Sequence, residues 1–166
     1  MARSTISGPA QLGPTSMVTY EVRVWLDVLT ARRAVKHLAS EIGFAPREST
    51  ELAIVASELG SNILKYGRHG TLGARALEVR DPRDEGIAIV ARDYGPPFHD
   101  LQTALQDGCD DRGPLDPLQL LSRKGIGGGL GAVLRLTHAF RVLPLAEGKE
   151  ILAERYLRRA LKPVAR

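Results

Sequence analysis

A glycine-rich segment late in the chain has the residue types and spacing to bind an anion. The sequence from 125 to 131 reads Gly125, Ile126, Gly127, Gly128, Gly129, Leu130, Gly131 and leads directly into a stretch with helical spacing. Without Cβ atoms, successive backbone N–H groups can turn toward one anion, and the N-terminal end of the next helix adds partial positive charge. The pattern is not a Walker A loop, because no Lys-Ser/Thr pair closes it, and no strand precedes it as in a dinucleotide fingerprint. It predicts a phosphate-binding loop, and the alternative is a flexible linker.

A second candidate is the polar face of a helix that carries Glu58 and Asn62 four residues apart, with Lys65 three residues further on. Residues at this spacing lie on one side of a helix. A carboxylate beside a carboxamide can orient a hydroxyl group and can ligate Mg²⁺ through oxygen. The alternative is an exposed hydrophilic edge that only forms a Glu–Lys contact.

A third candidate is Asp93, which comes at the end of an apolar stretch and is followed by Tyr94 and Gly95. A carboxylate at a strand end can accept a hydrogen bond from an amine such as adenine N6. The alternative is an ordinary turn after a strand.

The order and spacing of these three features resemble the Bergerat-fold (GHKL) ATP-binding family, which includes gyrase-type ATPases, histidine kinases and anti-sigma-factor kinases. In that family a helix carries Glu-x-x-x-Asn, a strand end carries Asp-x-Gly-x-Gly, and a glycine-rich lid holds the phosphates. The chain is most similar to the RsbT-like serine/threonine kinases of the bacterial stressosome, through Ser57 to Ile63, Leu105 to Gly108 and the glycine run. One position departs from the pattern: Pro97 stands where the family has the second glycine of its Asp-x-Gly-x-Gly box. This implies an adenine pocket that is either built with a different turn or weakened.

The resemblance implies a serine/threonine protein kinase that uses ATP and Mg²⁺. Asp93 and Gly95 would bind adenine, Asn62 would hold the metal, and Glu58 would accept the proton of the substrate hydroxyl. The phosphates would meet Lys65 and the glycine-rich loop, that is Gly125, Gly127, Gly128, Gly129, Leu130 and Gly131. The implied substrate is a STAS-domain antagonist or scaffold protein, and a sigma factor or a PP2C-type phosphatase is a possible further partner. Two alternatives stay open: an anti-sigma factor that mainly sequesters a sigma subunit, and a non-catalytic interaction module.

Hydrophobic periodicity indicates the elements that must position these residues. Strands are expected at 18–24, 74–80, 87–92, 140–145 and 150–157, and helices at 28–42, from about 49 to 66, at 101–106 and at 130–139. Ser49, Thr50 and Glu51 are expected to cap the second helix. Because helices and strands do not alternate, the element order favours a two-layer α/β (α+β) sandwich over a doubly wound parallel sheet. We expect a mixed, largely antiparallel sheet covered by helices on one face.

Length and composition limit the domain organisation and the classes of partner. The chain has 166 residues, 43% of them hydrophobic and 25% charged, which is ordinary globular usage. We expect one domain at 17–160 between tails at 1–16 and 161–166. A net charge of +4 permits an anionic partner, but only 5% of residues are aromatic, which argues against a nucleic-acid platform. No apolar run reaches the ~18 residues of a membrane span and no signal pattern is present, so the expected location is the cytoplasm.

Overall fold

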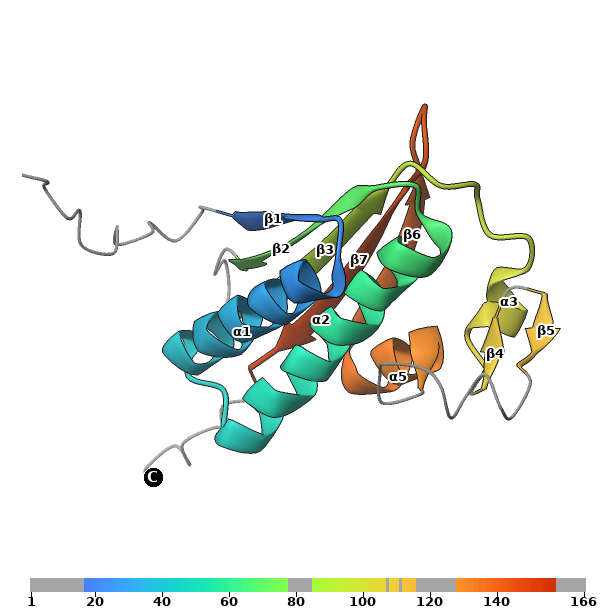
Figure 1. Ribbon diagram of the computed structural model, residues 1–166. Coiled ribbons are helices and arrows are strands. Elements are labelled where there is room, and N and C mark those ends of the chain that lie inside the picture. Colours follow the sequence, from blue (N-terminus) through green and yellow to red (C-terminus); the bar gives the residue numbers. More distant parts are fainter. Residues whose placement is uncertain (1–16, 78–84, 107, 111, 116–127, 158–166) are drawn as a thin grey trace, which may run out of the picture.

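A five-stranded antiparallel sheet is the centre of the fold (Figure 1). The computed structural model describes residues 17–77, 85–106, 108–110, 112–115 and 128–157. The strands, in their spatial order, are β1 (Val18–Val22), β2 (Gly70–Ala76), β3 (Gly86–Asp93), β7 (Lys149–Tyr156) and β6 (Ala139–Pro144). Every pairing between these described strands is antiparallel, so the sheet is more uniform than the mixed one expected from sequence.

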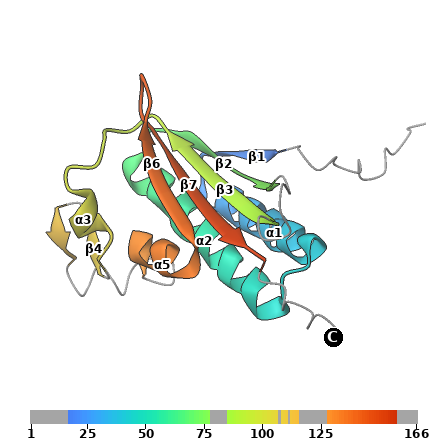
Figure 2. The same ribbon diagram turned by 180° about the vertical axis from the view of Figure 1, so that it is seen from behind.

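Helices cover one face of this sheet, and no helix of the described residues lies on the other face (Figures 1 and 2). The two long helices are α1 (Trp25–Ile42) and α2 (Pro46–Tyr66), and the shorter α5 (Gly129–Leu136) packs beside α2. Their apolar stripes meet the inward side chains of the strands in one core; Val28, Leu52, Leu59, Leu72 and Ile89 are among its fully buried members. The predicted two-layer α/β fold class is confirmed.

Both long helices begin earlier than the hydrophobic periodicity indicated. The Asp27 carboxylate accepts hydrogen bonds from the backbone N–H groups of Arg23 and Val24, at 2.8 and 3.0 Å, and so starts α1 at Trp25. The Glu48 carboxylate accepts the N–H of Ala45 at 3.0 Å, which starts α2 at Pro46.

The expected cap of the second helix at Ser49, Thr50 and Glu51 is therefore wrong. Proline is favourable at the first position of a helix, because the backbone N–H that proline lacks would have no hydrogen-bond partner within the helix there. These three residues consequently lie inside α2, where the hydroxyl groups of Ser49 and Thr50 donate to backbone carbonyls.

The second strand also begins and ends earlier than expected. The second strand spans Gly70–Ala76 rather than 74–80, because Gly70 to Ala74 pair with both β1 and β3 despite two glycines in that stretch. Residues 78–84, between β2 and β3, lie outside the described residues. Short elements follow β3: the helix α3 (Leu101–Ala104), and then a hairpin of two two-residue strands, β4 (Cys109–Asp110) and β5 (Gly113–Pro114). None of the helices in the described ranges is long and apolar enough to cross a membrane.

Candidate functional site

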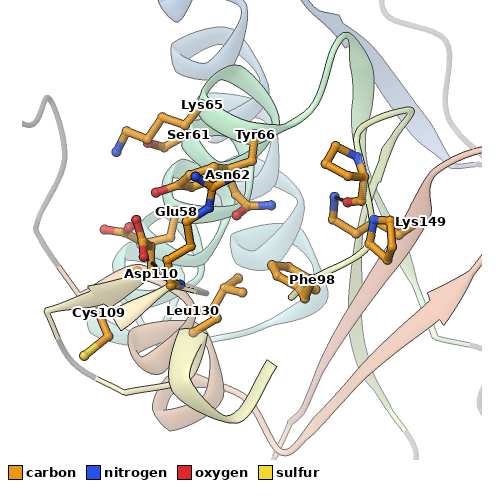
Figure 3. Close-up of a pocket in the computed structure, with 15 residues that line it drawn as sticks. Glu58, Ser61, Asn62, Lys65, Tyr66, Phe98, Cys109, Asp110, Leu130 and Lys149 are labelled. Atoms are coloured by element: carbon orange, nitrogen blue, oxygen red, sulfur yellow. Dashed lines mark hydrogen bonds between the residues drawn. The ribbon is translucent and has the colours of Figure 1, made fainter. Parts of the chain in front are cut away.

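A pocket of about 410 Å³ opens between α2, the segment after β3, the β4–β5 hairpin and the start of α5 (Figure 3). This volume lies within the usual range of small-molecule sites. Its lining comprises Glu58, Ser61, Asn62, Lys65, Tyr66, Pro96, Pro97, Phe98, Ala104, Cys109, Asp110, Arg112, Gly129, Leu130 and Lys149.

The α2 wall carries the polar face that the sequence predicted. Glu58, Asn62 and Lys65 all line the pocket, because the apolar stripe of α2 packs on the sheet and turns this face away from it. Figure 3 shows these side chains on one side of the pocket and Lys149 with Phe98 on the other. Glu58 and Asn62 are each only 8% exposed.

Asn62 has an unmet hydrogen-bonding need. Its Nδ2 atom is buried and has no hydrogen-bond partner among the described residues. A buried polar atom that stays unsatisfied costs free energy, so such an atom at a pocket wall favours a ligand that completes it.

Asp93 lies behind the pocket rather than on its wall. Its side chain is 1% exposed, and Oδ1 accepts hydrogen bonds from Gly95 N at 2.8 Å and from Lys149 Nζ at 2.9 Å. Gly95 does not line the pocket either; a Cβ at this position would collide with the carbonyl oxygen of Tyr66, so glycine is required by the close approach of the chain to the end of α2.

Lys149 is the charged group that does reach the pocket from this side. It is the first residue of β7 and stands opposite Asp93 in the β3–β7 register. Its ammonium also donates to the carbonyl of Pro96 at 2.9 Å and lies 5.1 Å from the centre of the Phe98 ring. The sequence analysis did not identify Lys149 as a site residue.

The glycine-rich segment is described only in its second half. Gly129, with φ +55°, and Leu130 line the pocket where α5 begins. Gly128 and Gly131 are not among the lining residues. Gly125 and Gly127 lie outside the described residues.

The charges on the pocket wall are mixed. Lys65, Arg112 and Lys149 supply positive charge, and Glu58 and Asp110 supply negative charge. A pocket lined by basic groups and by the glycine at the start of a helix is suited to phosphate groups. Arg112 and Asp110 belong to the β4–β5 region and carried no recognisable motif.

Within the described ranges, no three His, Cys, Asp or Glu side chains come together as a metal site. Mg²⁺ in nucleotide sites is commonly held by one or two protein oxygens together with the substrate phosphates and water. The carboxamide oxygen of Asn62 and the carboxylate of Glu58, on one wall of the pocket, fit that kind of site.

Three comparisons place the chain among known proteins. It matches the histidine kinase-like ATPase domain over residues 26–153. The serine/threonine-protein kinase RsbT of Bacillus subtilis (strain 168) is 32% identical over 133 residues, which cover 80% of this chain and 90% of that protein. The crystal structure of the RsbU and RsbW domains of Rv1364c from Mycobacterium tuberculosis superposes with a TM-score of 0.56 at 16% identity. That match covers 89% of this chain but 34% of the other, so this chain spans about a third of it, and the likeness concerns the fold.

Proposed function

We propose that this chain is an ATP-dependent serine/threonine kinase of the anti-sigma regulatory type. It belongs to the histidine kinase-like ATPase family and resembles the RsbT-like members of that family. The substrate would be a Ser or Thr of a STAS-domain partner, and phosphorylation would release that partner. The proposal rests on one observation: the buried side chains of Glu58 and Asn62 lie on the same wall of a pocket of nucleotide size.

The proposed transfer uses the residues of this wall. The substrate hydroxyl oxygen attacks the γ-phosphorus, the bond to the β-phosphate oxygen breaks, and ADP leaves. Glu58 accepts the hydroxyl proton as the new O–P bond forms. Mg²⁺, when bound, would neutralise charge on the transferring phosphoryl group.

The remaining residues would position the nucleotide. Asn62 would hold the metal through its carboxamide oxygen. Lys65 and the N–H groups of the glycine-rich loop at 125–131 would bind the phosphates, and Asp93 with Gly95 would form the base end of the site. The positive charges of Lys65 and Arg112 at the pocket support a phosphate-bearing ligand.

The first test is a calorimetric titration of the purified protein with ATP, with and without Mg²⁺. We expect Mg²⁺ to tighten binding, and we expect Asn62→Ala to remove this dependence on the metal. Lys36→Met, at an exposed position on α1, is the matched control and should bind like the wild type. Absence of nucleotide binding by the wild type would instead indicate a non-catalytic interaction module.

The second test separates chemistry from binding. Glu58→Gln is nearly isosteric, so it should keep ATP affinity while phosphoryl transfer to a STAS-domain partner falls by at least about tenfold. Undiminished transfer would remove Glu58 from the mechanism. If the protein co-purifies with a sigma factor rather than with a STAS-domain protein, its main role is sequestration.

A further inference from the structure

The outward face of α1 carries large apolar side chains that the core of the protein does not use. Val24, directly before the helix, and Leu26 and Leu29 on its first turns are 56%, 68% and 39% exposed. Single exposed apolar residues are common on protein surfaces, whereas a group of them in one place marks an interaction site.

Two cations continue this face along the helix. Leu26, Leu29, Arg33 and Lys36 follow one another at steps of three or four residues, so they lie along one side of α1. The buried residues of α1 lie on the opposite side, where the helix packs on the sheet and on α2. Both cations are exposed, and neither forms an ion pair with another described residue. We call Val24, Leu26, Leu29, Arg33 and Lys36 the α1 stripe.

The carboxylates of α1 near the stripe have partners of their own. Asp27 accepts the backbone N–H groups of Arg23 and Val24. Glu41 lies beyond the stripe, with Oε1 3.5 Å from Nε2 of His37. The stripe therefore has an apolar end and a basic end, and a complementary surface combines apolar side chains with carboxylates.

The stripe and the pocket lie on opposite sides of α2. Figure 1 shows α2 between α1 and the elements that border the pocket, α5 and the β4–β5 hairpin. Gly60 of α2 lies between Glu58 and Asn62 in the chain, and a Cβ there would be 2.6 Å from Cγ1 of Val28 on α1. Because α1 packs against the back of this wall, a partner on the stripe leaves the pocket open.

We propose that the α1 stripe is the docking surface for a helix of a partner protein, and that this helix carries leucine-sized apolar residues at one end and Asp or Glu residues at the other. From Leu26 to Lys36 the stripe is about 15 Å long, which is about three turns and matches one face of a second helix. The inference goes beyond the proposed function, which assigns no surface to the partner, and it does not depend on nucleotide binding.

A membrane surface and a second copy of this chain fit the stripe less well. A helix that lies on a membrane needs a broad apolar face turned to the lipid, and the broad apolar face of α1 is buried in the core. A symmetric contact between two copies brings the same patch against itself. It would place Arg33 and Lys36 of both copies in one interface without a carboxylate of the stripe to pair them.

The experiment uses two synthetic helical peptides of about 18 residues, or about five turns. Both carry leucines along one face; the acidic peptide has glutamates beside them, and its twin has lysines at the same positions. Binding of each fluorescently labelled peptide to the full-length protein is measured by anisotropy, at low salt and without nucleotide. We expect the acidic peptide to bind at least about tenfold more tightly than its twin. Equal binding of the two, or no binding of either, overturns the proposal.

Two double variants locate the contact. Leu26→Ser, Leu29→Ser changes exposed side chains only and should weaken the acidic peptide at least about tenfold. Arg33→Glu, Lys36→Glu should reverse the preference in favour of the lysine peptide. Leu143→Ser, at a leucine of β6 that is 43% exposed, is the matched control and should bind like the wild type. Unchanged binding by the two double variants overturns the proposal.

The same variants test the other occupants. A dimer in sedimentation equilibrium that Leu26→Ser, Leu29→Ser dissociates would identify a second copy as the occupant. Sedimentation of the wild type, but not of this variant, with vesicles of phosphatidylcholine and phosphatidylserine would identify a membrane. Either result overturns the assignment to a partner protein.

Calorimetry with ATP and Mg²⁺ separates the stripe from the pocket. Both double variants should keep the wild-type ATP affinity, because α2 lies between the two sites. A parallel loss of ATP affinity would overturn the assignment of the stripe as a separate surface. If the wild type binds the acidic peptide but not ATP, the proposed function fails and the docking surface stands.

Discussion

Lys149 and Asp93 form an ion pair between neighbouring strands, with Nζ 2.9 Å from Oδ1 and side chains that are 3% and 1% exposed. Taking two charges out of water is costly, and the cost is offset only when further hydrogen bonds complete both groups. Here the N–H of Gly95 completes the carboxylate and the carbonyl of Pro96 completes the ammonium. The pair ties the start of β7 to the end of β3 and to the segment that leads into the pocket.

The first prediction concerns the energy of this pair. Lys149→Met should lower the free energy of unfolding by about 3 kcal/mol, because it leaves the Asp93 carboxylate buried without its counter-ion. The double variant Asp93→Asn, Lys149→Met should lose less than the sum of the two single variants. Urea denaturation, followed by circular dichroism, measures the free energy of unfolding of the wild type, of Lys149→Met, of Asp93→Asn and of the double variant. Additive losses would mean that the two charges do not depend on each other.

The local pattern of the sequence predicted the helical side of the site, because residues four apart on a helix share a face whatever the rest of the chain does. Glu58, Asn62 and Lys65 accordingly reach one pocket wall. The same local reasoning failed at β2. Glycines have a low propensity for strands, but this strand is stabilised by its pairing with β1 on one side and β3 on the other.

The pairing of Lys149 with Asp93 could not be predicted in this way. Lys149 is 56 residues from Asp93, and the two meet only because β7 pairs with β3 in one particular register. Register between distant strands follows from the packing of the whole sheet. A lysine at the start of an apolar strand gave no signal of its own.

A second prediction concerns the contact between the sheet and α2. The Arg155 guanidinium donates to Glu51 at 2.8 Å, and this hydrogen bond lowers the pKa of the Glu51 carboxyl from its ordinary value of 4.5. A carboxyl whose pKa is lower in the folded state stabilises the fold above its unfolded pKa and loses that contribution as the pH falls through the folded value.

Glu51→Gln should therefore lower the free energy of unfolding by about 1 kcal/mol at neutral pH. The difference from the wild type should shrink as the pH is lowered from 4.5 toward the folded pKa. Denaturation curves across this range measure it, with Glu147→Gln, at an exposed position, as the control. A difference that stays constant with pH would contradict the assignment to charge.

The third prediction concerns Pro97, which lines the pocket directly after the proline whose carbonyl holds Lys149. Glycine at this position, as in the family motif, can take a positive φ that proline cannot. Pro97→Gly should tighten ATP binding by about tenfold and cost up to about 1 kcal/mol of stability through the looser unfolded chain. Calorimetry and thermal melting check the two effects. Pro46→Gly, at the far end of α2, should cost stability without changing affinity.

The last prediction concerns Gly148, which sets the position of Lys149. Gly148 has φ +86°, and a Cβ there would collide with the carbonyl oxygen of Asp93 and lie 2.7 Å from the Cα of Tyr94. Gly113 provides a matched control, because its φ is +135° and a Cβ would have nothing within 4 Å. Alanine at either position meets the backbone strain of a positive φ, which costs about 1 kcal/mol, but only Gly148→Ala adds a clash.

We expect Gly148→Ala to destabilise the protein by at least about 2 kcal/mol more than Gly113→Ala, a difference in the range of clearly disruptive substitutions. The clash should push the turn away from Asp93 and carry the Lys149 ammonium with it, because the two residues are adjacent in the chain. Nucleotide affinity should then weaken in the folded fraction of Gly148→Ala, measured by calorimetry at a temperature below its melting point. Equal losses of stability in the two variants would show that the turn can move without strain and that Gly148 does not position Lys149.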